Sequence, residues 1–431
     1  MPEISAGDTA WILTSAAFVL LMTPGLAFFY GGMVRAKGVL NMLMMSFLCL
    51  AIVPVIWVLY GYSLAFDGTN GGLVGGLGKV GLDGVGLDSV SGTIPEFAFV
   101  AFQAVFAIIT AALISGAIAE RATFRGWAIF VILWVTVVYF PVANWVWGGG
   151  WIAELGAIDF AGGTVVHINA GAAALALAIV LGKRHGWRRD PMRPHNLPFV
   201  LLGAGLLWFG WFGFNAGSAL AADGLASAVW VNTLVATAAA VLGWLLIDVI
   251  KQKHSTTLGA ASGAIAGLVA ITPACAFVSP LGAILVGLVA GSICALAVGL
   301  KYKFGYDDSL DVVAVHLVGG VVGTLMIGLL ATEAFTGDAA LEGLFYGGGI
   351  DLLWKQAVAA GAVIAYSFVV ALILGIAIHK IIGFRVSEDD EIGGIDLAVH
   401  VETGYDITQA AGPSGLSVPA AAVRAKEGSV S

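Results

Sequence analysis

Long apolar runs, separated by short polar stretches, fill the chain from residue 10 to residue 381. An apolar run of about 18 residues or more is long enough to cross the hydrocarbon core of a bilayer as a helix. Eleven transmembrane helices are predicted, at 10–33, 41–65, 97–119, 126–143, 164–182, 198–221, 226–250, 257–277, 280–300, 311–332 and 350–381. We therefore expect an all-α integral membrane protein.

The composition agrees with this pattern. Of the 431 residues, 59% are hydrophobic and 11% are charged, whereas a soluble globular protein carries about 25% charged residues. The 60 glycines suit the close packing of transmembrane helices. The net charge of −8 offers no basic surface for nucleic acid, which excludes nucleic-acid binding as a class of function.

Basic residues are concentrated in alternate loops of the predicted bundle. These residues are Arg35, Lys37, Arg121, Arg125, Lys183, Arg184, Arg188, Arg189, Arg193, Lys251, Lys253, Lys301, Lys303, Lys380 and Arg385. The opposite loops contain only Lys79 and Lys355, beside many acidic residues. Because cytoplasmic loops carry an excess of Lys and Arg, we expect the N-terminus outside and the C-terminus in the cytoplasm. The protein would then be a multi-pass protein of the cytoplasmic membrane.

The composition changes after Arg385. We expect residues 1–385 to form the transmembrane domain and residues 386–431 to form a cytoplasmic C-terminal tail. The tail contains the acidic run 388–391, and its last part is rich in Ala, Ser, Gly and Val. Such a polar, low-complexity composition predicts partial disorder.

A short internal repeat relates the two halves of the chain. DFAGGTVVH opens the fifth span, with Asp159 eight residues before His167, and DSLDVVAVH opens the tenth, with Asp308 eight residues before His316. Equivalent helices that are five spans apart enter the membrane from opposite sides. The pattern therefore predicts an inverted five-plus-five repeat, with a substrate site at the interface of the halves near the membrane midplane.

His167 and His316 each lie in an otherwise apolar predicted helix. Ionisable groups there are costly and usually face the interior of the bundle or a cavity. A single histidine would more often join helices by a hydrogen bond, but a pair at equivalent positions favours a shared site. Two facing imidazoles can pass a proton or hold a hydrogen-bonding guest. A zinc site is the competing interpretation, but no carboxylate or thiol lies at metal-ligand spacing, so we expect no metal.

Other polar and aromatic residues near these spans have two interpretations each. Asp159 either caps a helix N-terminus or attracts a cation by its charge. Most of the aromatic residues pack in the core or at the membrane interface, yet aromatic faces also hold cations. Ser218, one turn after Phe214, is placed to accept a hydrogen bond from such a cation.

Seven segments resemble the ammonium transporter family, which contains the Amt and Mep proteins and the related Rhesus proteins. These segments are TPGLAFFYGGMVR at 23–35, FQAVFAIITAALISGAIAER at 102–121, WVWGGGW at 145–151, DFAGGTVVHINAG at 159–171, WFGFNAGSA at 211–219, ITPACA at 271–276 and DDSLDVVAVHLVGG at 307–320. They span the predicted helices in the order of the family. DFAGGTVVH is the most specific of them.

The resemblance implies roles for individual residues. An outer site that recruits the cation would contain Phe106, Trp147 and Ser218, and Phe106 and Phe214 would stack below it as a gate. His167 and His316 would be the paired histidines of the pore. Asp159 would support recruitment and deprotonation of the cation. Thr272 and Phe102 are weaker matches near the vestibule.

The resemblance also implies partners. Family members are homotrimers with one pore in each subunit, surrounded by membrane lipids. Residues 383–406 are similar to the regulatory C-terminus of bacterial members, on which a PII-type signalling protein docks. Because Phe106 and Trp147 are both present, the Amt branch is favoured over the Rhesus branch.

We therefore expect transport of ammonium or ammonia, with no cofactor. The cation would be recruited outside and deprotonated near the gate, and ammonia would pass along the two histidines. One alternative is a transporter of another small cation or a neutral amine, and another is a membrane sensor that binds ammonium. An enzyme is not expected, because the sequence has no P-loop, GxSxG, HExxH or dinucleotide-binding motif.

Overall fold

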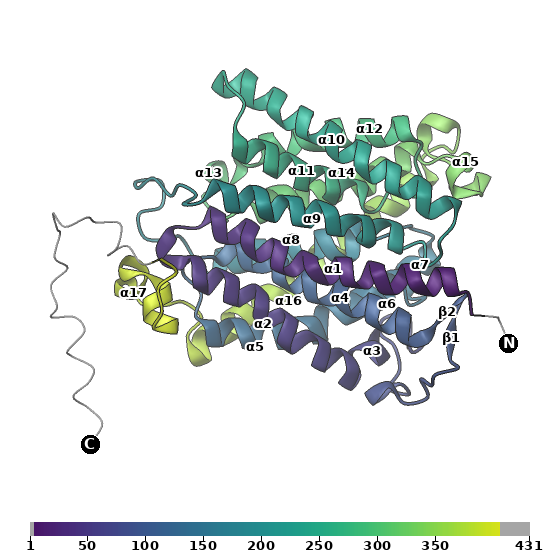
Figure 1. Ribbon diagram of the computed structural model, residues 1–431, viewed down its shortest axis with the longest axis horizontal. Helices are drawn as coiled ribbons and strands as arrows, with labels where there is room; N and C mark the ends of the chain where they lie inside the picture. The colour runs from purple at the N-terminus through teal and green to yellow at the C-terminus, as the bar shows by residue number, and fades with distance from the viewer. Residues whose placement is uncertain (1–3, 406–431) are drawn as a thin grey trace.

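The computed structural model describes residues 4–405 and is mostly helical (Figure 1). Among these residues, ten helical segments are long and apolar enough to cross a membrane. The predicted span at 257–277 is shorter than expected: it forms helix α11 (Thr257–Ile271) of 15 residues. The helix ends there because Pro273 has no backbone N–H to continue the hydrogen-bonding pattern.

The ten long segments follow the predicted apolar runs. They are Ala6–Met33, Ala36–Phe66, Glu96–Ile118, Phe124–Leu155, Gly163–Leu181, Leu197–Gly217, Gly224–Gln252, Pro280–Phe304, Val313–Leu330 and Asp351–Ile382. In a bilayer every backbone N–H and C=O must find its partner within the protein, so apolar runs of this length are stable as helices.

Several segments contain more than one element. The main helices are α1 (Ala6–Met33), α2 (Val39–Ile56), α3 (Tyr62–Phe66), α4 (Glu96–Ile114), α5 (Phe124–Trp134), α6 (Phe140–Val146), α7 (Trp151–Leu155), α8 (Asn169–Leu181), α9 (Leu197–Gly217), α10 (Gly224–Gln252), α12 (Pro280–Ala297), α13 (Leu300–Phe304), α14 (Gly319–Leu330), α15 (Glu333–Thr336), α16 (Asp351–Ile382) and α17 (Glu388–Gly393). Single π-helical turns are η2 (Trp57–Gly61), η5 (Val135–Tyr139), η6 (Gly163–Ile168), η7 (Val313–Val318) and η10 (Asp396–His400). Short 3-10 turns are η1 (Ala36–Gly38), η3 (Val80–Leu82), η4 (Ser115–Ile118), η8 (Ala339–Leu341) and η9 (Leu344–Tyr346), and the two strands are β1 (Val90–Ser91) and β2 (Ile94–Pro95).

The long helices lie side by side along the longest axis of the molecule (Figure 1). The α7 end of the bundle carries α7, α15 and the β1–β2 hairpin, and the opposite α17 end carries α13 and α17. Helix α1 begins at the α7 end. The backbones of α1 and α9 approach each other closely at Gly203 of α9. A Cβ atom added to Gly203 would lie 2.2 Å from the backbone nitrogen of Phe29, so only glycine allows this approach.

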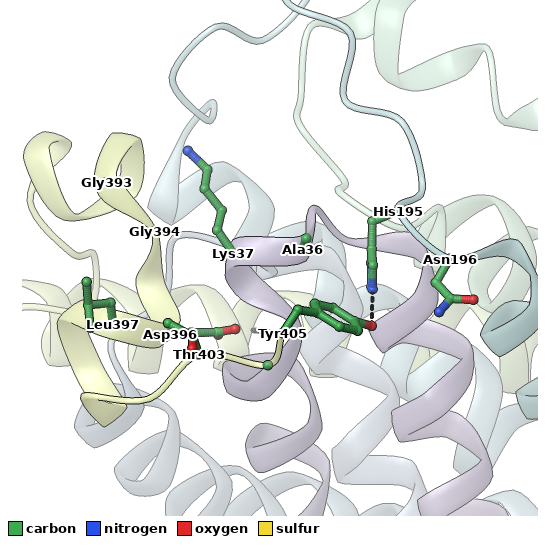
Figure 2. A pocket seen from close by; sticks show the side chains of 11 residues that line it. Ala36, Lys37, His195, Asn196, Gly393, Gly394, Asp396, Leu397, Thr403 and Tyr405 are labelled. Carbon is green, nitrogen blue, oxygen red and sulfur yellow. Dashed lines mark hydrogen bonds between the residues drawn. The ribbon is translucent and has the colours of Figure 1, made fainter. Parts of the chain in front are cut away.

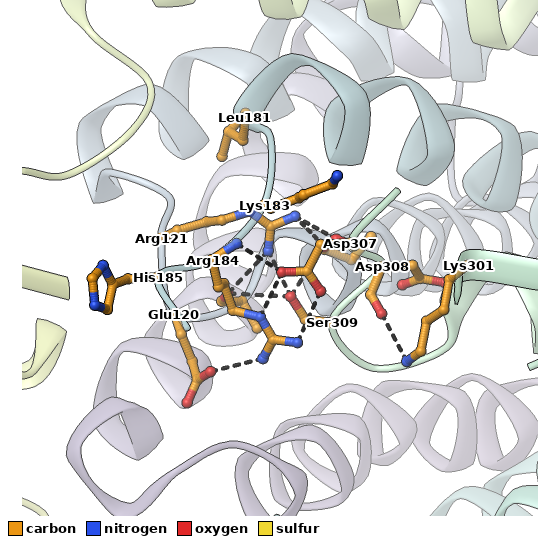
Figure 3. Close-up of polar contacts among 12 residues, drawn as sticks. Glu120, Arg121, Leu181, Lys183, Arg184, His185, Lys301, Asp307, Asp308 and Ser309 are labelled. Atoms are coloured by element: carbon orange, nitrogen blue, oxygen red, sulfur yellow. Dashed lines mark hydrogen bonds and ion pairs between the residues drawn. The ribbon is translucent and has the colours of Figure 1, made fainter. Parts of the chain in front are cut away.

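A buried ion-pair network joins the loops at the α17 end (Figure 3). Glu120 accepts hydrogen bonds from Arg35 and Arg184, each at 2.8 Å, and Arg184 also pairs with both carboxylate oxygens of Asp307 at 2.9 Å. Burial alone would raise the pKa of Asp307, but the hydrogen bonds and the charge of Arg184 lower that pKa below its ordinary value. The network therefore stays ionised at neutral pH and fixes the loop that precedes η7.

Asp307→Ala is expected to destabilise the protein by about 3–5 kcal/mol, because it leaves the buried guanidinium of Arg184 without its carboxylate. Thermal unfolding of the purified variant measures the effect. Asp351→Ala is the matched control, since its pair with Lys355 is exposed to solvent and should contribute little to stability. Equal shifts in melting temperature for the two variants would contradict the role of the network.

The predicted tail is described as far as Tyr405, and residues 406–431 lie outside the described residues. The described part packs against the α17 end. Asp396 accepts hydrogen bonds from the backbone N–H groups of Leu40 (2.9 Å) and Asn41 (2.8 Å) at the start of α2. Figure 2 shows the adjoining pocket, where the Tyr405 hydroxyl lies 2.7 Å from Nε2 of His195. The C-terminal segment is thus bound to the same loops that the ion pairs connect.

Candidate functional site

The two predicted histidines meet in the centre of the bundle. His167 lies in η6 and His316 in η7, and both side chains are almost fully buried. Their Nδ1 atoms are 3.3 Å apart, and their ring centroids are 5.4 Å apart with an angle of 26° between the planes. Both turns are π-helical, a local geometry that is frequent at functional sites.

The contact between the two Nδ1 atoms fixes what the pair offers to a guest. A neutral imidazole has one N–H, so one ring donates through Nδ1 and the other accepts there. The donating ring then has an accepting Nε2, and the accepting ring carries its hydrogen on Nε2. The pair therefore presents one acceptor and one donor, and Nε2 of His167 has no hydrogen-bond partner among the described residues.

A narrow apolar cavity surrounds the histidines. Its lining is Met22, Leu26, Phe29, Ile109, Leu113, Val166, His167, Leu207, Trp211, Phe214, Ile265 and His316. Its volume of about 10 Å³ is close to the smallest that holds a single water-sized molecule. Apart from the two imidazoles and the indole N–H of Trp211, the lining side chains carry no polar atom. Nε1 of Trp211 donates instead to the hydroxyl of Thr272 at 2.8 Å.

Two phenylalanine rings close this cavity on the side of the α7 end. Phe106 and Phe214 stack with centroids 4.1 Å apart and an angle of 29° between the planes. Both are buried, and Phe214 is also stacked on His167 at 6.1 Å. A guest that reaches the histidines from that side must displace these rings.

A wider vestibule of about 440 Å³ lies on the other side of the two phenylalanines. It is lined by Phe66, Ser91, Phe99, Phe102, Gln103, Phe106, Val146, Trp147, Phe160, Ser218 and Leu220. The rings of Trp147 and Phe106 meet edge to face, with centroids 6.0 Å apart. Aromatic faces in such a pocket favour a small cation.

Ser218 adds an acceptor to the vestibule. Its hydroxyl donates its hydrogen to the backbone oxygen of Phe214 at 2.8 Å, which leaves the lone pairs of the Ser218 oxygen to receive a donor. The vestibule thus combines aromatic faces with a hydroxyl oxygen that is oriented as an acceptor.

Asp159 has the geometry of a helix cap. Its carboxylate accepts from the backbone N–H groups of Gly162 (2.8 Å), Gly163 (2.7 Å) and Thr164 (2.7 Å), and from the Thr164 hydroxyl. The side chain is buried, and its backbone oxygen accepts from Nε1 of Trp147 at 2.9 Å. Asp159 therefore holds the start of η6 and links it directly to the vestibule.

Phe102 and Thr272, the two weaker matches to the family, lie in different places. Phe102 lines the vestibule, whereas Thr272 lies behind Trp211, bonded to it, and is outside the vestibule lining. Sequence reasoning did not select Gln103 or Ser91, which also line the vestibule. Gln103 stands beside Phe102 in the matched motif, but Ser91 comes from a polar loop and no pattern marked it. No group of three or more His, Cys, Asp or Glu residues that could hold a metal occurs between residues 4 and 405.

The chain as a whole is similar to known proteins. The model of the Ammonium Transporter Family matches residues 10–405 of the chain. The chain belongs to this family. The family expected from the sequence motifs is therefore confirmed.

Individual relatives cover nearly the whole chain. A protein of Mycobacterium tuberculosis named ammonium transporter is 57% identical over 436 residues, which cover 94% of this chain and 91% of the relative. The solved structure of Mep2 from Candida albicans has a TM-score of 0.81 at 37% identity and covers 90% of this chain and 88% of its own. A solved structure named Sensor Amt Protein has a TM-score of 0.84 at 30% identity, with 91% and 98% covered.

Membership of the ammonium transporter family supports ammonium transport as the activity of the protein. It also supports a general role as a transporter rather than as an enzyme. Together with the ten long apolar helices of the described chain, it indicates a multi-pass membrane protein.

Proposed function

We propose that the protein moves ammonium across the cytoplasmic membrane by separating it into ammonia and a proton. NH4⁺ is recruited in the vestibule by Phe106, Trp147 and Ser218. It loses one proton at the gate of Phe106 and Phe214. Asp159 favours recruitment by its negative charge, and it supports deprotonation by holding the start of η6, which carries His167. NH3 then passes along His167 and His316, and the released proton crosses separately by transfer between the same two imidazoles, whose Nδ1 atoms are 3.3 Å apart. Each NH4⁺ taken up therefore moves one positive charge across the membrane.

The observation that carries this proposal is the order in which the features adjoin one another. A vestibule with cation-binding chemistry is followed by two stacked rings, and these by a cavity of about 10 Å³ with a histidine pair. The histidines offer one donor and one acceptor, which matches ammonia, a molecule that donates through N–H and accepts at its lone pair. A site for a larger substrate would need more room than this cavity has.

The narrow apolar cavity also explains selectivity. Potassium and ammonium are similar in size and equal in charge, and an ion pays on the order of 20 kcal/mol in the idealised transfer from water to a medium of low dielectric. Two imidazoles cannot replace the hydration shell of an ion. Ammonium alone escapes this cost, because it can release a proton and enter as a neutral molecule.

We further propose that eleven spans, including α11, cross the membrane as an inverted five-plus-five repeat with the N-terminus outside and the C-terminus in the cytoplasm. The opposite entry of η6 and η7 into the bundle, each after a capping aspartate, supports this topology: Asp308 accepts from the backbone N–H of Val313 at 2.7 Å, as Asp159 does from the start of η6. Residues 1–385 form the transmembrane domain and residues 386–431 the tail. Labelling of a single cysteine in each loop of intact cells tests this topology.

We also propose a homotrimer and a PII-type partner. Large apolar side chains on α10 and α12 are exposed in the single chain, among them Leu242 and Leu281, which supports contact with lipid or with another subunit. The C-terminal segment at the proposed cytoplasmic face is the docking surface for the PII-type protein. The mass of the purified complex, with and without a PII protein, tests both proposals.

Uptake of labelled methylammonium into proteoliposomes tests the transport function. We expect uptake that an excess of ammonium inhibits and an equal excess of potassium leaves unchanged. Inhibition by potassium would favour a general cation transporter. Ammonium binding without uptake would favour a sensor, the class named for one structural relative.

Trp147→Leu is expected to raise the half-saturating ammonium concentration by about 2- to 30-fold, because a cation over an aromatic face gains about 0.5–2 kcal/mol. Concentration series of ammonium uptake measure this. Trp151→Leu is the control, since Trp151 begins α7 and does not line the vestibule. An unchanged half-saturating concentration in the Trp147 variant would exclude the recruitment role.

A further inference from the structure

Gln356 of α16 is completely buried and forms an unusual pair of contacts. Its Oε1 accepts from the backbone N–H of Ile158 at 2.8 Å, and its Nε2 donates to the backbone oxygen of the same residue at 2.7 Å. Nε2 also donates to the backbone oxygen of Thr324 in α14 at 3.3 Å. One side-chain amide thus binds both polar groups of a residue 198 positions away and ties it to a third segment.

The residue held in this way immediately precedes Asp159. The backbone oxygen of Asp159 is held by the Trp147 indole at 2.9 Å, and the backbone N–H of Phe160 donates to the oxygen of Pro273 at 3.2 Å. Three consecutive residues of the loop are therefore fixed by three different parts of the chain. The loop has no regular secondary structure of its own between α7 and η6, so these contacts determine its path.

We infer that Gln356 is a positioning residue for the transport site: it sets the peptide before Asp159, and through it the carboxylate that caps η6 and orients His167. This inference rests on the proposed function. Few contacts separate Gln356 from His167. Asp159 binds the N–H groups of Gly162, Gly163 and Thr164, and His167 follows within the same turn. Helix α16, the last long span and the one beyond the two repeats, thereby acts on the first repeat.

A buried glutamine in a membrane helix costs free energy unless its amide group is hydrogen-bonded, and these contacts supply the partners. An apolar side chain of the same size would fill the space, but it would leave the N–H and C=O of Ile158 without these partners. The amide matches both groups at once because it carries an acceptor and a donor on one carbon. Gln356 touches neither the vestibule nor the cavity, so it acts through Asp159 and not on the substrate.

Two variants separate positioning from simple packing. Gln356→Met keeps the length of the side chain and removes the hydrogen bonds. Gln356→Glu keeps an acceptor and a donor while the carboxyl group is protonated, and loses the donor when the proton leaves. Tyr366→Phe is the control, since it removes another hydrogen bond from α16 to a backbone oxygen, that of Val137, without touching the Asp159 loop.

The readout is the ammonium-evoked current per mole of purified protein, measured with equal pH on both sides from pH 5 to pH 9, beside the melting temperature at each pH. We expect Gln356→Met to lower the maximal current about tenfold or more at every pH, because small displacements of a reacting group are costly. We expect the current of Gln356→Glu, relative to wild type, to fall as pH rises, and Tyr366→Phe to match wild type.

Wild-type current with Gln356→Met would overturn the inference, as would a constant ratio between Gln356→Glu and wild type across the pH range. If Gln356→Met does not fold, the pH profile of Gln356→Glu decides alone. Failure of the proposed function is distinguishable, because the wild-type protein itself would then give no ammonium-selective signal.

Discussion

His167→Ala combined with His316→Ala is expected to abolish ammonium-selective transport. The two imidazoles supply the polar partners of the narrow cavity, and their Nδ1 atoms are 3.3 Å apart. Without them a passing ammonia molecule loses its hydrogen bonds in apolar surroundings, at about 1–3 kcal/mol for each unsatisfied group. The cost of both contacts together slows passage by about two orders of magnitude or more, and the emptied space admits water and ions.

Ammonium and potassium uptake by proteoliposomes measure both consequences. The double variant should lose ammonium uptake or gain potassium uptake. The control is His254→Ala with His379→Ala, which removes two exposed histidines outside the pore and should behave as wild type. Unchanged transport and unchanged selectivity in the pore variant would refute the role of the histidine pair.

Asp159→Ala is expected to remove transport and to lower stability together. The carboxylate satisfies the backbone N–H groups of Gly162, Gly163 and Thr164, and each buried N–H left without a partner costs about 1–3 kcal/mol. The start of η6 would lose its cap, and the vestibule would lose the negative charge that favours the cation. Asp159→Asn should keep part of the cap and lose the charge, so it separates the two contributions.

Maximal uptake and melting temperature are measured for each variant. Asp223→Ala is the control, because Asp223 also caps a helix, accepting from Ala226 at 2.9 Å at the start of α10, but is exposed and outside the vestibule. We expect that variant to transport normally. Full transport by Asp159→Ala would show that the aspartate has no part in the mechanism.

The sequence indicated the helices and the central pair well, for physical reasons. Apolar runs long enough for a bilayer have few alternatives to a helix. The repeated spacing of Asp159 and His167, and of Asp308 and His316, predicted a shared site because ionisable residues in apolar helices must face a common interior. The length of α11 was overestimated, since hydropathy continues past Ile271 although Pro273 ends the helix.

Other features depend on distant parts of the chain. No local pattern shows that Gln356 binds Ile158, because 198 residues separate them. The π-helical turns at both histidines have the same composition as ordinary helix. The ion pairs of Glu120, Arg184 and Asp307 come from three loops, whose basic residues the sequence explained only as an orientation signal.

The central claim is that the protein discriminates between ammonium and potassium because only a cation that can lose a proton crosses the narrow cavity. Currents from the purified protein in supported membranes, after equal jumps of ammonium and of potassium, test it most directly. We predict a current with ammonium, a smaller one with methylammonium and none with potassium. A potassium current of similar size would contradict the claim, because it would mean that an ion which cannot lose a proton passes the histidine pair.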